Sequence, residues 1–278
     1  MKPELKTEKF FLQYKEEQIE NTLLWESHCH ANFELIAVID GGISVTLEGR
    51  NYRLNRGEAI VIPPLSYHAI KVNKAGVYKR LTVLFDQSSI PEVLAPRFSG
   101  NSILINNLSA YLTSELQRIC TENDKDFYSP LAESFMTEIL YTLARAAEDP
   151  IANERDGLLE KIILYVDENL CNQILLDDLA AHTSRSKSSV CHLFEEKMKI
   201  SPKQYILQKK LALATHLIKS GTPPTSAAIR VGYDNYSNFY RIYKKYYGVS
   251  PTSQTSQSTL RPRLDGDETY TLREEQKL

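Results

Sequence analysis

The period at which apolar residues recur changes along this chain and divides it into a strand-rich part and a helical part. Between residues 33 and 85, short apolar runs such as FELIAVID and EAIVIPP alternate with turns that contain glycine or proline. Short strands separated by regular turns are typical of an antiparallel sandwich or barrel. After residue 108 the apolar residues recur at helical spacing. We therefore predict an α+β multidomain protein: an antiparallel β-barrel with a helical hairpin, then an all-α domain.

The length of 278 residues also favours more than one domain, since a typical domain has about 100–200 residues. We expect the second helix of the hairpin to begin at Ser129 and Pro130, because serine followed by proline is a common helix start. The hairpin either covers the barrel or forms a dimer interface. The predicted boundaries are 1–100 for the barrel, 101–148 for the hairpin, 149–157 for a linker, 158–252 for the helical domain and 253–278 for a disordered polar tail.

Composition argues against a membrane protein and a disulfide framework. The chain is 42% hydrophobic and 24% charged, which is ordinary globular usage, and no apolar run approaches the roughly 18 residues of a membrane span. The first thirty residues lack the apolar core of a secretory signal, so we expect a cytoplasmic protein with no membrane partner. The cysteines lack CxxC spacing and are expected to be free thiols; they are Cys29, Cys120, Cys171 and Cys191.

Charge is distributed unevenly along the chain. Between residues 182 and 251, twelve Lys and Arg residues stand against three Asp and Glu residues, a net charge of +9, although the whole chain carries −2. A basic segment on an otherwise acidic chain is typical of a nucleic-acid site, because each Lys or Arg near a phosphate releases condensed counterions. A solvated basic face would carry the same charge, so charge alone does not identify the partner.

Two segments of the basic region have the pattern of a helix-turn-helix unit, in which a short helix and a tight turn precede a longer helix with one apolar face. A predicted helix that contains Leu207 and Ile218 and ends before Gly221 joins the two units. The short helix, turn and long helix are expected at 175–183, 184–186 and 187–198 in the first unit, and at 225–231, 232–234 and 235–247 in the second.

The apolar positions of each long helix face the core, which leaves small polar and basic side chains on the outer face. Such side chains suit the major groove of DNA, where base edges are read through hydrogen bonds and phosphates through charge. Two such helices on one rigid body would enter successive major-groove segments about 34 Å apart. The candidate DNA-binding residues are Lys187, Ser188, Cys191 and His192 in the first unit, and Tyr236, Ser237, Asn238, Tyr240, Arg241, Lys244 and Lys245 in the second.

The segment GYDNYSNFYRIYKKYYGVSP, residues 232–251, resembles the second-motif signature of the AraC/XylS family of bacterial transcription regulators. Upstream, LDDLA at 176–180 and SPKQY at 201–205 are similar to the first motif and the joining helix of that family. The chain departs from the family at Ala227, where isoleucine is usual, and at Pro223 and Pro224. The resemblance implies binding to double-stranded promoter DNA, a small-molecule effector and a homodimer. An activator of this kind would also contact RNA polymerase.

The strand-rich part carries a second pattern, His28, His30 and Glu34, followed later by His68. Alternation along a strand places the first three side chains on one face, which points into the barrel. The spacing resembles the two motifs of cupin barrels, in which two histidines, a glutamate and a later histidine can converge on one metal ion. Leu65 departs from that pattern, since metal-binding cupins usually carry glycine there.

Three interpretations of these four residues remain open. The family resemblance implies that they bind a small molecule, such as a sugar or an organic acid. Imidazole and carboxylate together would also suit a divalent transition metal, although no cofactor is required. Alternatively, the histidines are structural residues at the mouth of the barrel.

Together these patterns predict a ligand-responsive, DNA-binding transcription regulator, and not an enzyme, that controls an operon for a carbohydrate or a related metabolite. One alternative is a metal-dependent cupin enzyme with a helical appendage, which leaves the basic helical half unexplained. Another is an adaptor whose helical half binds protein.

Overall fold

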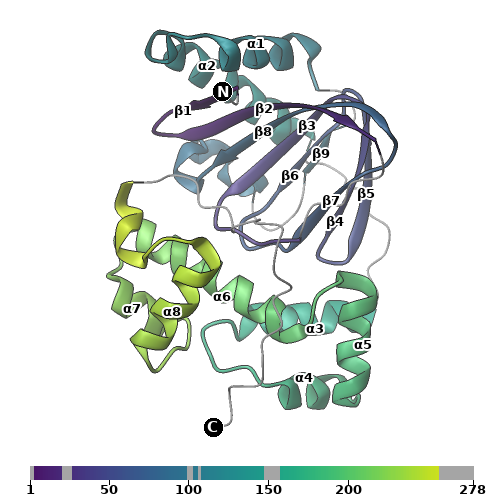
Figure 1. Ribbon diagram of the computed structural model, residues 1–278, viewed down its shortest axis with the longest axis vertical. Coiled ribbons are helices and arrows are strands. Elements are labelled where there is room, and N and C mark those ends of the chain that lie inside the picture. Colours follow the sequence, from purple (N-terminus) through teal and green to yellow (C-terminus); the bar gives the residue numbers. More distant parts are fainter. Residues whose placement is uncertain (1–2, 21–26, 99–102, 106–107, 147–156, 257–278) are drawn as a thin grey trace.

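The computed structural model describes residues 3–20, 27–98, 103–105, 108–146 and 157–256, which form an N-terminal β domain with a helical hairpin and a C-terminal helical domain (Figure 1). The predicted linker and tail lie mostly outside the described residues. Their described parts belong to α3 and to the short helix η3, Pro251–Ser256. Within the described ranges, every helix is too short or too polar to span a lipid bilayer. All four cysteines are free thiols.

The described strands of the N-terminal domain form two antiparallel sheets, ordered β1-β2-β8-β3-β6-β9 and β5-β4-β7. Their bounds are Glu4–Lys6 (β1), Phe10–Ile19 (β2), Phe33–Asp40 (β3), Gly42–Leu47 (β4), Arg50–Asn55 (β5), Ala59–Ile62 (β6), His68–Val72 (β7), Gly76–Phe85 (β8) and Ile103–Ile105 (β9). The short strands expected between residues 33 and 85 are present as β3 to β8. The other three lie outside the predicted set, and β2 escaped prediction because its second half is mostly polar.

The predicted antiparallel β domain is confirmed, but its described sheets are not closed into a barrel. The described strands form two stacked sheets with separate edges, and one isolated bridge between His28 and His68 links the approach to β3 with β7. Sandwiches and barrels share the same alternation of short strands, whereas closure depends on how the edges pair. The apolar pattern therefore does not distinguish the two.

Apolar side chains from both sheets meet between them. Ile36 and Val38 of the larger sheet belong to one buried cluster with Ile43 and Val45 of the smaller sheet, and none is more than 2% exposed. Alternate residues of β3, such as Leu35, pack on the opposite face in the cluster that includes the hairpin helices. The larger sheet is therefore covered on both faces, which explains the continuous apolar run of β3.

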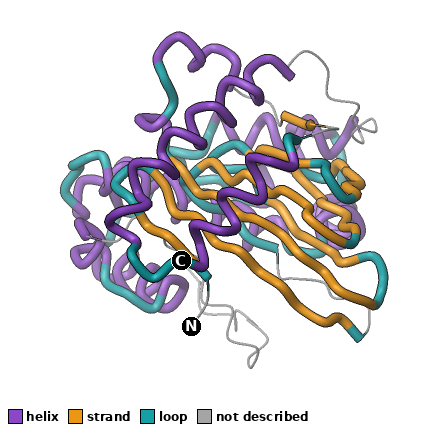
Figure 2. Tube along the Cα trace, turned by 90° about the horizontal axis from the view of Figure 1, so that it is seen from above, coloured by secondary structure: helices purple, strands orange, loops and turns teal. Residues whose placement is uncertain are grey.

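The helices α1, Ala110–Thr121, and α2, Lys125–Ala146, form the predicted hairpin and lie across the larger sheet (Figure 2). The predicted start of the second helix is wrong, because α2 begins at Lys125 and contains Pro130. Asp124 provides the cap, since its Oδ1 accepts a hydrogen bond from the amide of Phe127 at 3.1 Å. Asp124 and Ser129 are both residue types that commonly cap a helix, and the helix begins after Asp124.

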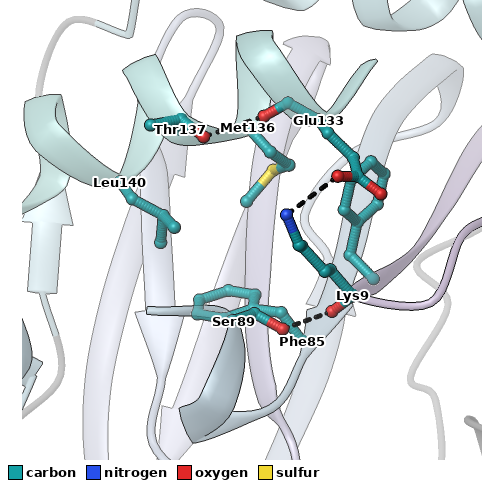
Figure 3. A pocket seen from close by; sticks show the side chains of 8 residues that line it. Lys9, Phe85, Ser89, Glu133, Met136, Thr137 and Leu140 are labelled. Atoms are coloured by element: carbon teal, nitrogen blue, oxygen red, sulfur yellow. Dashed lines mark hydrogen bonds and ion pairs between the residues drawn. The ribbon is translucent and has the colours of Figure 1, made fainter. Parts of the chain in front are cut away.

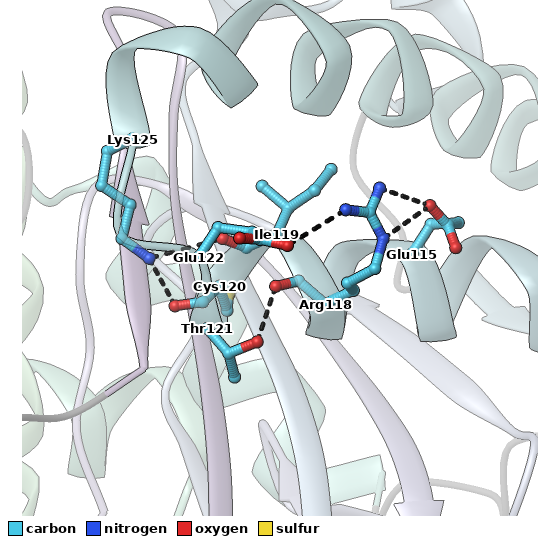
Figure 4. A network of polar contacts seen from close by, with 7 residues as sticks. All are labelled: Glu115, Arg118, Ile119, Cys120, Thr121, Glu122 and Lys125. Atoms are coloured by element: carbon cyan, nitrogen blue, oxygen red, sulfur yellow. Dashed lines mark hydrogen bonds and ion pairs between the residues drawn. The ribbon is translucent and has the colours of Figure 1, made fainter.

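Polar contacts fix the hairpin at its turn and against the sheet. Lys125 Nζ donates to the carbonyls of Ile119, at 3.3 Å, and Cys120, in the last turn of α1 (Figure 4). Farther along α2, Glu133 forms a 3.0 Å ion pair with Lys9 beside a small hollow lined by apolar side chains (Figure 3). These contacts place the hairpin firmly on the sheet.

Helices α3 to α8 form the C-terminal domain and match both predicted helix-turn-helix units to within one residue at each end. Three of these helices have a capped N-terminus. The side-chain oxygen of the cap residue accepts a hydrogen bond from the amide three residues later, and the caps are Ser186 for α5, Ser201 for α6 and Asn235 for α8. The bounds are Gly157–Glu168 (α3), Leu176–Thr183 (α4), Lys187–Met198 (α5), Pro202–Lys219 (α6), Pro224–Arg230 (α7) and Tyr236–Tyr247 (α8).

The short helix α7 packs tightly even though its sequence departs from the family pattern. Pro224 occupies the first helical position, where the missing amide would have no helical partner anyway. Ala227 and Ala228 are both 0% exposed, in one cluster with Phe239 and Tyr243 of α8. A small residue at 227 therefore suits this close packing.

A buried lysine supports the end of α7. Lys210 Nζ, from α6, donates to the carbonyls of Asn172 at 2.6 Å and Val231 at 2.9 Å. Gly232 follows with a φ of 82°, and a Cβ there would lie 2.8 Å from Lys210 Nζ. Glycine is thus required at 232 both by its backbone conformation and by space.

Candidate functional site

The long helix of the first unit, α5, presents its predicted outer face to solvent. Val190 and Phe194, both 0% exposed, anchor the opposite face in the core. Three candidate DNA-binding residues on the outer face are exposed, Lys187, Ser188 and His192, and Cys191 is half-buried.

The long helix of the second unit, α8, has the same arrangement, with one difference. Tyr236 is half-buried and packs against the core, its ring centroid 6.0 Å from that of Phe239. Arg241 and Asn238 lie together on the outer face, where Nη2 of Arg241 donates to Oδ1 of Asn238 at 3.2 Å. Of the remaining candidates, Tyr240 is half-buried, and the exposed ones are Ser237, Lys244 and Lys245.

Acidic side chains lie close to the basic residues of the first unit. Lys187 Nζ is 2.6 Å from Oδ1 of Asp177. Near the other end of α5, Glu196 pairs with Lys197 at 2.8 Å. These contacts offset part of the positive charge on α5.

Of the twelve basic residues between 182 and 251, Lys209 and Lys210 are buried and Lys219 is half-buried, and all three form structural contacts. Lys209 is 3% exposed beside Glu48, Lys210 is 8% exposed at the backbone carbonyls, and Lys219 donates to Oδ1 of Asn32 at 3.3 Å. The other nine are exposed: Arg185, Lys187, Lys197, Lys199, Lys203, Arg230, Arg241, Lys244 and Lys245. The basic surface is therefore smaller than the sequence count suggests.

The structure brings the four predicted ligand residues of the N-terminal domain together. One possible ligand atom from each of His28, His30, Glu34 and His68 lies within 4.8 Å of all the others. The backbones of His28 and His68 exchange two hydrogen bonds of 2.9 Å, which hold the two motifs side by side. His30, Glu34 and His68 are at most 4% exposed, and His28 is half-buried. We call these four residues the histidine–glutamate site.

Backbone carbonyls orient two of the imidazole rings. Nδ1 of His30 lies 2.9 Å from the carbonyl oxygen of Asn32, and Nδ1 of His68 lies 2.9 Å from that of Ser66. Because a carbonyl only accepts, these contacts assign the proton to Nδ1 in both rings. Nε2 then faces Oε2 of Glu34, at 2.9 Å from His30 and 3.1 Å from His68. Histidines that bind metals are commonly oriented in this way.

The charge state of the histidine–glutamate site favours a cation. Burial alone would raise the pKa of the Glu34 carboxyl, but hydrogen bonds from His30 and His68 hold that pKa well below its ordinary value. The carboxylate is therefore ionised and needs positive charge beside it. Two imidazolium rings would supply it, at the cost of repelling each other in a buried place. One divalent ion held by the Nε2 lone pairs would supply it without that repulsion.

A second buried polar cluster, which the sequence patterns did not reveal, lies where the two domains meet. Glu48, at the tip of the hairpin between β4 and β5, accepts hydrogen bonds from the hydroxyl of Tyr205 at 2.7 Å and from Nζ of Lys209 at 3.1 Å. Lys209 also pairs with Asp167 of α3. The only signal in the sequence is a glutamate in a two-residue turn, where asparagine or aspartate is usual.

Two family models match the chain. The model described as "AraC-like ligand binding domain" matches residues 13–140, and the one described as "Helix-turn-helix domain" matches residues 179–256. The first match covers most of the two sheets and the hairpin. The second extends from within α4 to the end of η3.

Relatives with similar sequences match most of the chain. The uncharacterized HTH-type transcriptional regulator YdiP of Escherichia coli K12 is 26% identical over 261 residues, 84% of this chain and 82% of YdiP. The HTH-type transcriptional activator RhaR of Enterobacter sp. 638 is 23% identical and covers 82% of this chain and 86% of its own. Among solved structures, fatty-acid-bound ToxT of Vibrio cholerae aligns with 89% of this chain and 95% of ToxT, at 13% identity and a TM-score of 0.43.

Proposed function

Because the chain belongs to the AraC family of transcriptional regulators, we propose that it reads promoter DNA with α5 and α8 and that its histidine–glutamate site binds a divalent metal ion. Membership of this family favours a regulator over the metal-dependent enzyme. It also accounts for the basic helical half, which the enzyme leaves unexplained.

The DNA-binding proposal is supported above all by the outer faces of α5 and α8. Both helices begin at capped N-termini, which favour nearby phosphates, and both expose polar and basic side chains on one domain. We propose that the second unit supplies most base contacts, through Arg241 and Asn238, and that the first unit relies more on phosphate contacts. The proposed DNA-binding set is the one predicted from the sequence, with Tyr236 contributing less because it is half-buried.

Promoter binding is tested with the full chain by fluorescence anisotropy, at several salt concentrations and against random DNA. Arg241→Ala should weaken specific binding by about 1–3 kcal/mol. Lys161→Ala removes the same charge from an exposed position on α3, outside both helix-turn-helix units, and should change little. A wild-type protein that binds its promoter no better than random DNA would refute the proposal.

The metal proposal is supported by the closed packing of the histidine–glutamate site. Three imidazole nitrogens and a carboxylate oxygen are a donor set that suits zinc, manganese, iron or nickel. Their mutual separation of at most 4.8 Å fits one ion between them, and three of the four residues are buried. A sugar at the same place would have to displace these side chains.

Metal binding is tested by metal analysis of the purified protein and by thermal shift with Mn²⁺, Zn²⁺ and Ni²⁺. We expect one ion per chain in the wild type and none in His68→Ala. His216→Ala removes an exposed histidine of α6 and should retain full uptake. Equal uptake by wild type and His68→Ala would show that the ion binds elsewhere.

A sugar or organic acid is our second candidate for the effector. A hollow of about 260 Å³ between the β5–β6 turn and α1 favours it, because its lining includes Arg56, Glu58, Thr113, Ser114 and Gln117. Charged and hydroxyl groups of this kind suit hydroxyls and carboxylates. Stabilisation by such compounds, but not by metals, in the same thermal-shift screen would favour this candidate.

We further propose a cytoplasmic homodimer that joins through the outer face of the hairpin. Phe127, Leu131 and Tyr141 of α2 are 72%, 39% and 47% exposed. Apolar side chains gathered on one helix face commonly mark a protein interface. The chain would then act on a carbohydrate or related operon, with RNA polymerase as a partner if it activates. For the domains, we propose the same boundaries that the sequence predicts.

A further inference from the structure

The tip of the β4–β5 hairpin is inserted into the C-terminal domain. A Cβ at Gly49 would lie 2.4 Å from Cδ2 of Leu159 and 3.5 Å from Sδ of Met198, so the bare backbone packs directly on α3 and α5. Next to it, Glu48 is 6% exposed and contacts Tyr205 and Lys209 of α6. The hairpin tip is therefore a contact between domains more than 100 residues apart in the sequence.

Local backbone preference does not account for glutamate at position 48. Leu47 pairs with Arg50, so the turn has only two residues, and both have a positive φ, 46° at Glu48 and 78° at Gly49. Such turns favour asparagine or aspartate in the first position, and a longer side chain costs about 1 kcal/mol in this conformation. The buried contacts of the Glu48 carboxylate explain why glutamate lies here.

The carboxylate of Glu48 is matched to a buried cation. Burial alone would lower the pKa of Lys209, but Glu48 and Asp167 raise that pKa above its ordinary value. The hydroxyl of Tyr205 donates to the same carboxylate, and the pKa of Tyr205 is raised well above its ordinary value by burial and by Glu48. Lys209 is thus held charged and Tyr205 neutral when the domains are docked.

Glu48 is also bonded to the strand that carries part of the histidine–glutamate site. Oε1 of Glu48 accepts from the amide of Tyr67 at 2.8 Å, and the amide of Glu48 donates to the carbonyl of Tyr67 at 2.9 Å. The ring of Tyr67 packs edge-on against that of Tyr205, with centroids 5.7 Å apart. The next residue is His68. One residue therefore separates the interdomain contact from the proposed metal ligand.

The other loop of the site also contacts the C-terminal domain. Cys29, between His28 and His30, is 0% exposed and belongs to the same buried cluster as Leu159 of α3. Asn32 accepts from Nδ1 of His30 through its carbonyl and from Nζ of Lys219 through its side chain. Both loops that hold the histidines therefore lie against the helical domain.

We propose that Glu48 and Tyr205 form a latch between the domains, and that Tyr67 and His68 couple this latch to the histidine–glutamate site. The inference rests on the proposed metal site. An ion that fixes both histidine loops favours the docked arrangement, because the same loops form the docking surface. Since such coupling is reciprocal, the latch must strengthen metal binding by the same factor by which metal strengthens docking.

Because the coupling is reciprocal, it can be tested by a substitution in the C-terminal domain that changes metal binding in the N-terminal domain. Tyr205→Phe removes one hydroxyl from the C-terminal domain and touches no residue of the histidine–glutamate site directly. We expect it to weaken Mn²⁺ or Zn²⁺ binding about five-fold or more, as measured by calorimetry on the full chain. Glu48→Gln, which keeps the size of the side chain, should act in the same direction.

Tyr243→Phe is the matched control. Its hydroxyl is also buried in the C-terminal domain, where it is hydrogen-bonded to the hydroxyl of Thr215 on α6 at 3.0 Å. It should lose stability while it keeps wild-type metal affinity. If Tyr205→Phe and Glu48→Gln also bind metal as tightly as the wild type, the latch is refuted while the metal site stands. If the wild type takes up no metal, the proposed metal site is wrong, and the coupling with it.

Discussion

Lys209 and Lys210 follow each other on α6 but hold different parts of the molecule. Successive side chains of a helix point about 100° apart, so Lys209 reaches Glu48 in the N-terminal domain while Lys210 reaches two carbonyls near the second unit. The structural role of each lysine therefore depends on which acceptor its ammonium group contacts. Two adjacent lysines therefore connect the joining helix α6 to the N-terminal domain and to the second unit.

Gly232→Ala should destabilise the second unit. The substitution forces alanine into a positive φ and places a Cβ 2.8 Å from Lys210 Nζ and 3.2 Å from the backbone of Asn172. We expect the free energy of unfolding to fall by about 2–4 kcal/mol in urea titrations. Gly221→Ala has a similar φ of 91° with open space around it, and should lose only about 1–2 kcal/mol. Equal losses in the two variants would show that the contact with Lys210 has no effect.

The grouping of the four residues of the histidine–glutamate site could be predicted from their spacing, but the expected strand alternation was wrong for His28 and His30, which precede β3. The contacts of Glu48 could not be predicted, since its partners lie 157 and 161 residues away and belong to another domain. For the same reason, the charge count of the basic segment included Lys209 and Lys210 although both are buried. Which lysine is buried depends on a distant carboxylate or carbonyl that local pattern does not contain.

At the scale of elements, the two reading helices differ in their electrostatic surroundings. Asp177 of α4 lies against Lys187 at the start of α5. DNA phosphates would have to compete with that carboxylate for the lysine. The acidic side chain of the short helix therefore weakens the attraction of the first unit for DNA, whereas the outer face of α8 carries three exposed basic residues, Arg241, Lys244 and Lys245.

Asp177→Asn should raise DNA affinity about two- to five-fold at low salt, because it frees Lys187 and removes a negative charge near the phosphates. The gain should shrink as salt rises, since both side chains are more than half exposed. Glu168→Gln removes one negative charge from an exposed position at the end of α3 and serves as the control. Anisotropy titrations measure both. A gain of the same size in the control would assign the effect to net charge alone.

Helical elements were easier to predict than strands. Apolar spacing and caps located both units to within one residue, because those signals are local. The start of α2 was misplaced because Asp124 and Ser129 are both plausible caps, and only packing on the sheet decides between them. Strand β2 was missed because half of it is polar, yet it pairs with β8 along ten residues.

In the whole molecule, the hairpin covers one side of the larger sheet, and the C-terminal domain lies on the other side of the two stacked sheets (Figure 1). The apolar face of α2 is therefore open to a second copy while the reading helices remain exposed. The proposed homodimer and the proposed DNA complex would therefore use different surfaces. By contrast, the apolar pattern of neither domain indicates that the two domains pack against each other.

Replacing both Phe127 and Leu131 by serine should convert the dimer to a monomer at micromolar concentrations, as measured by sedimentation velocity. Each side chain is exposed in the single chain, so the substitutions should leave folding intact. Val93→Ser changes an equally exposed apolar residue, 73% exposed in η2, Glu92–Phe98, and should leave the dimer unchanged. A double variant that sediments as the wild type would place the interface elsewhere.

The burial of Lys209 limits how this regulator can be recombined with others. A chimera that joins its C-terminal helices to a foreign sensor without an acid at the hairpin tip would leave Lys209 with Asp167 alone, in a place where an unmatched charge is costly. Glu48, Tyr205 and Lys209 would have to be transplanted together. Exchange of ligand specificity between such regulators is therefore constrained by a contact that binds neither ligand nor DNA.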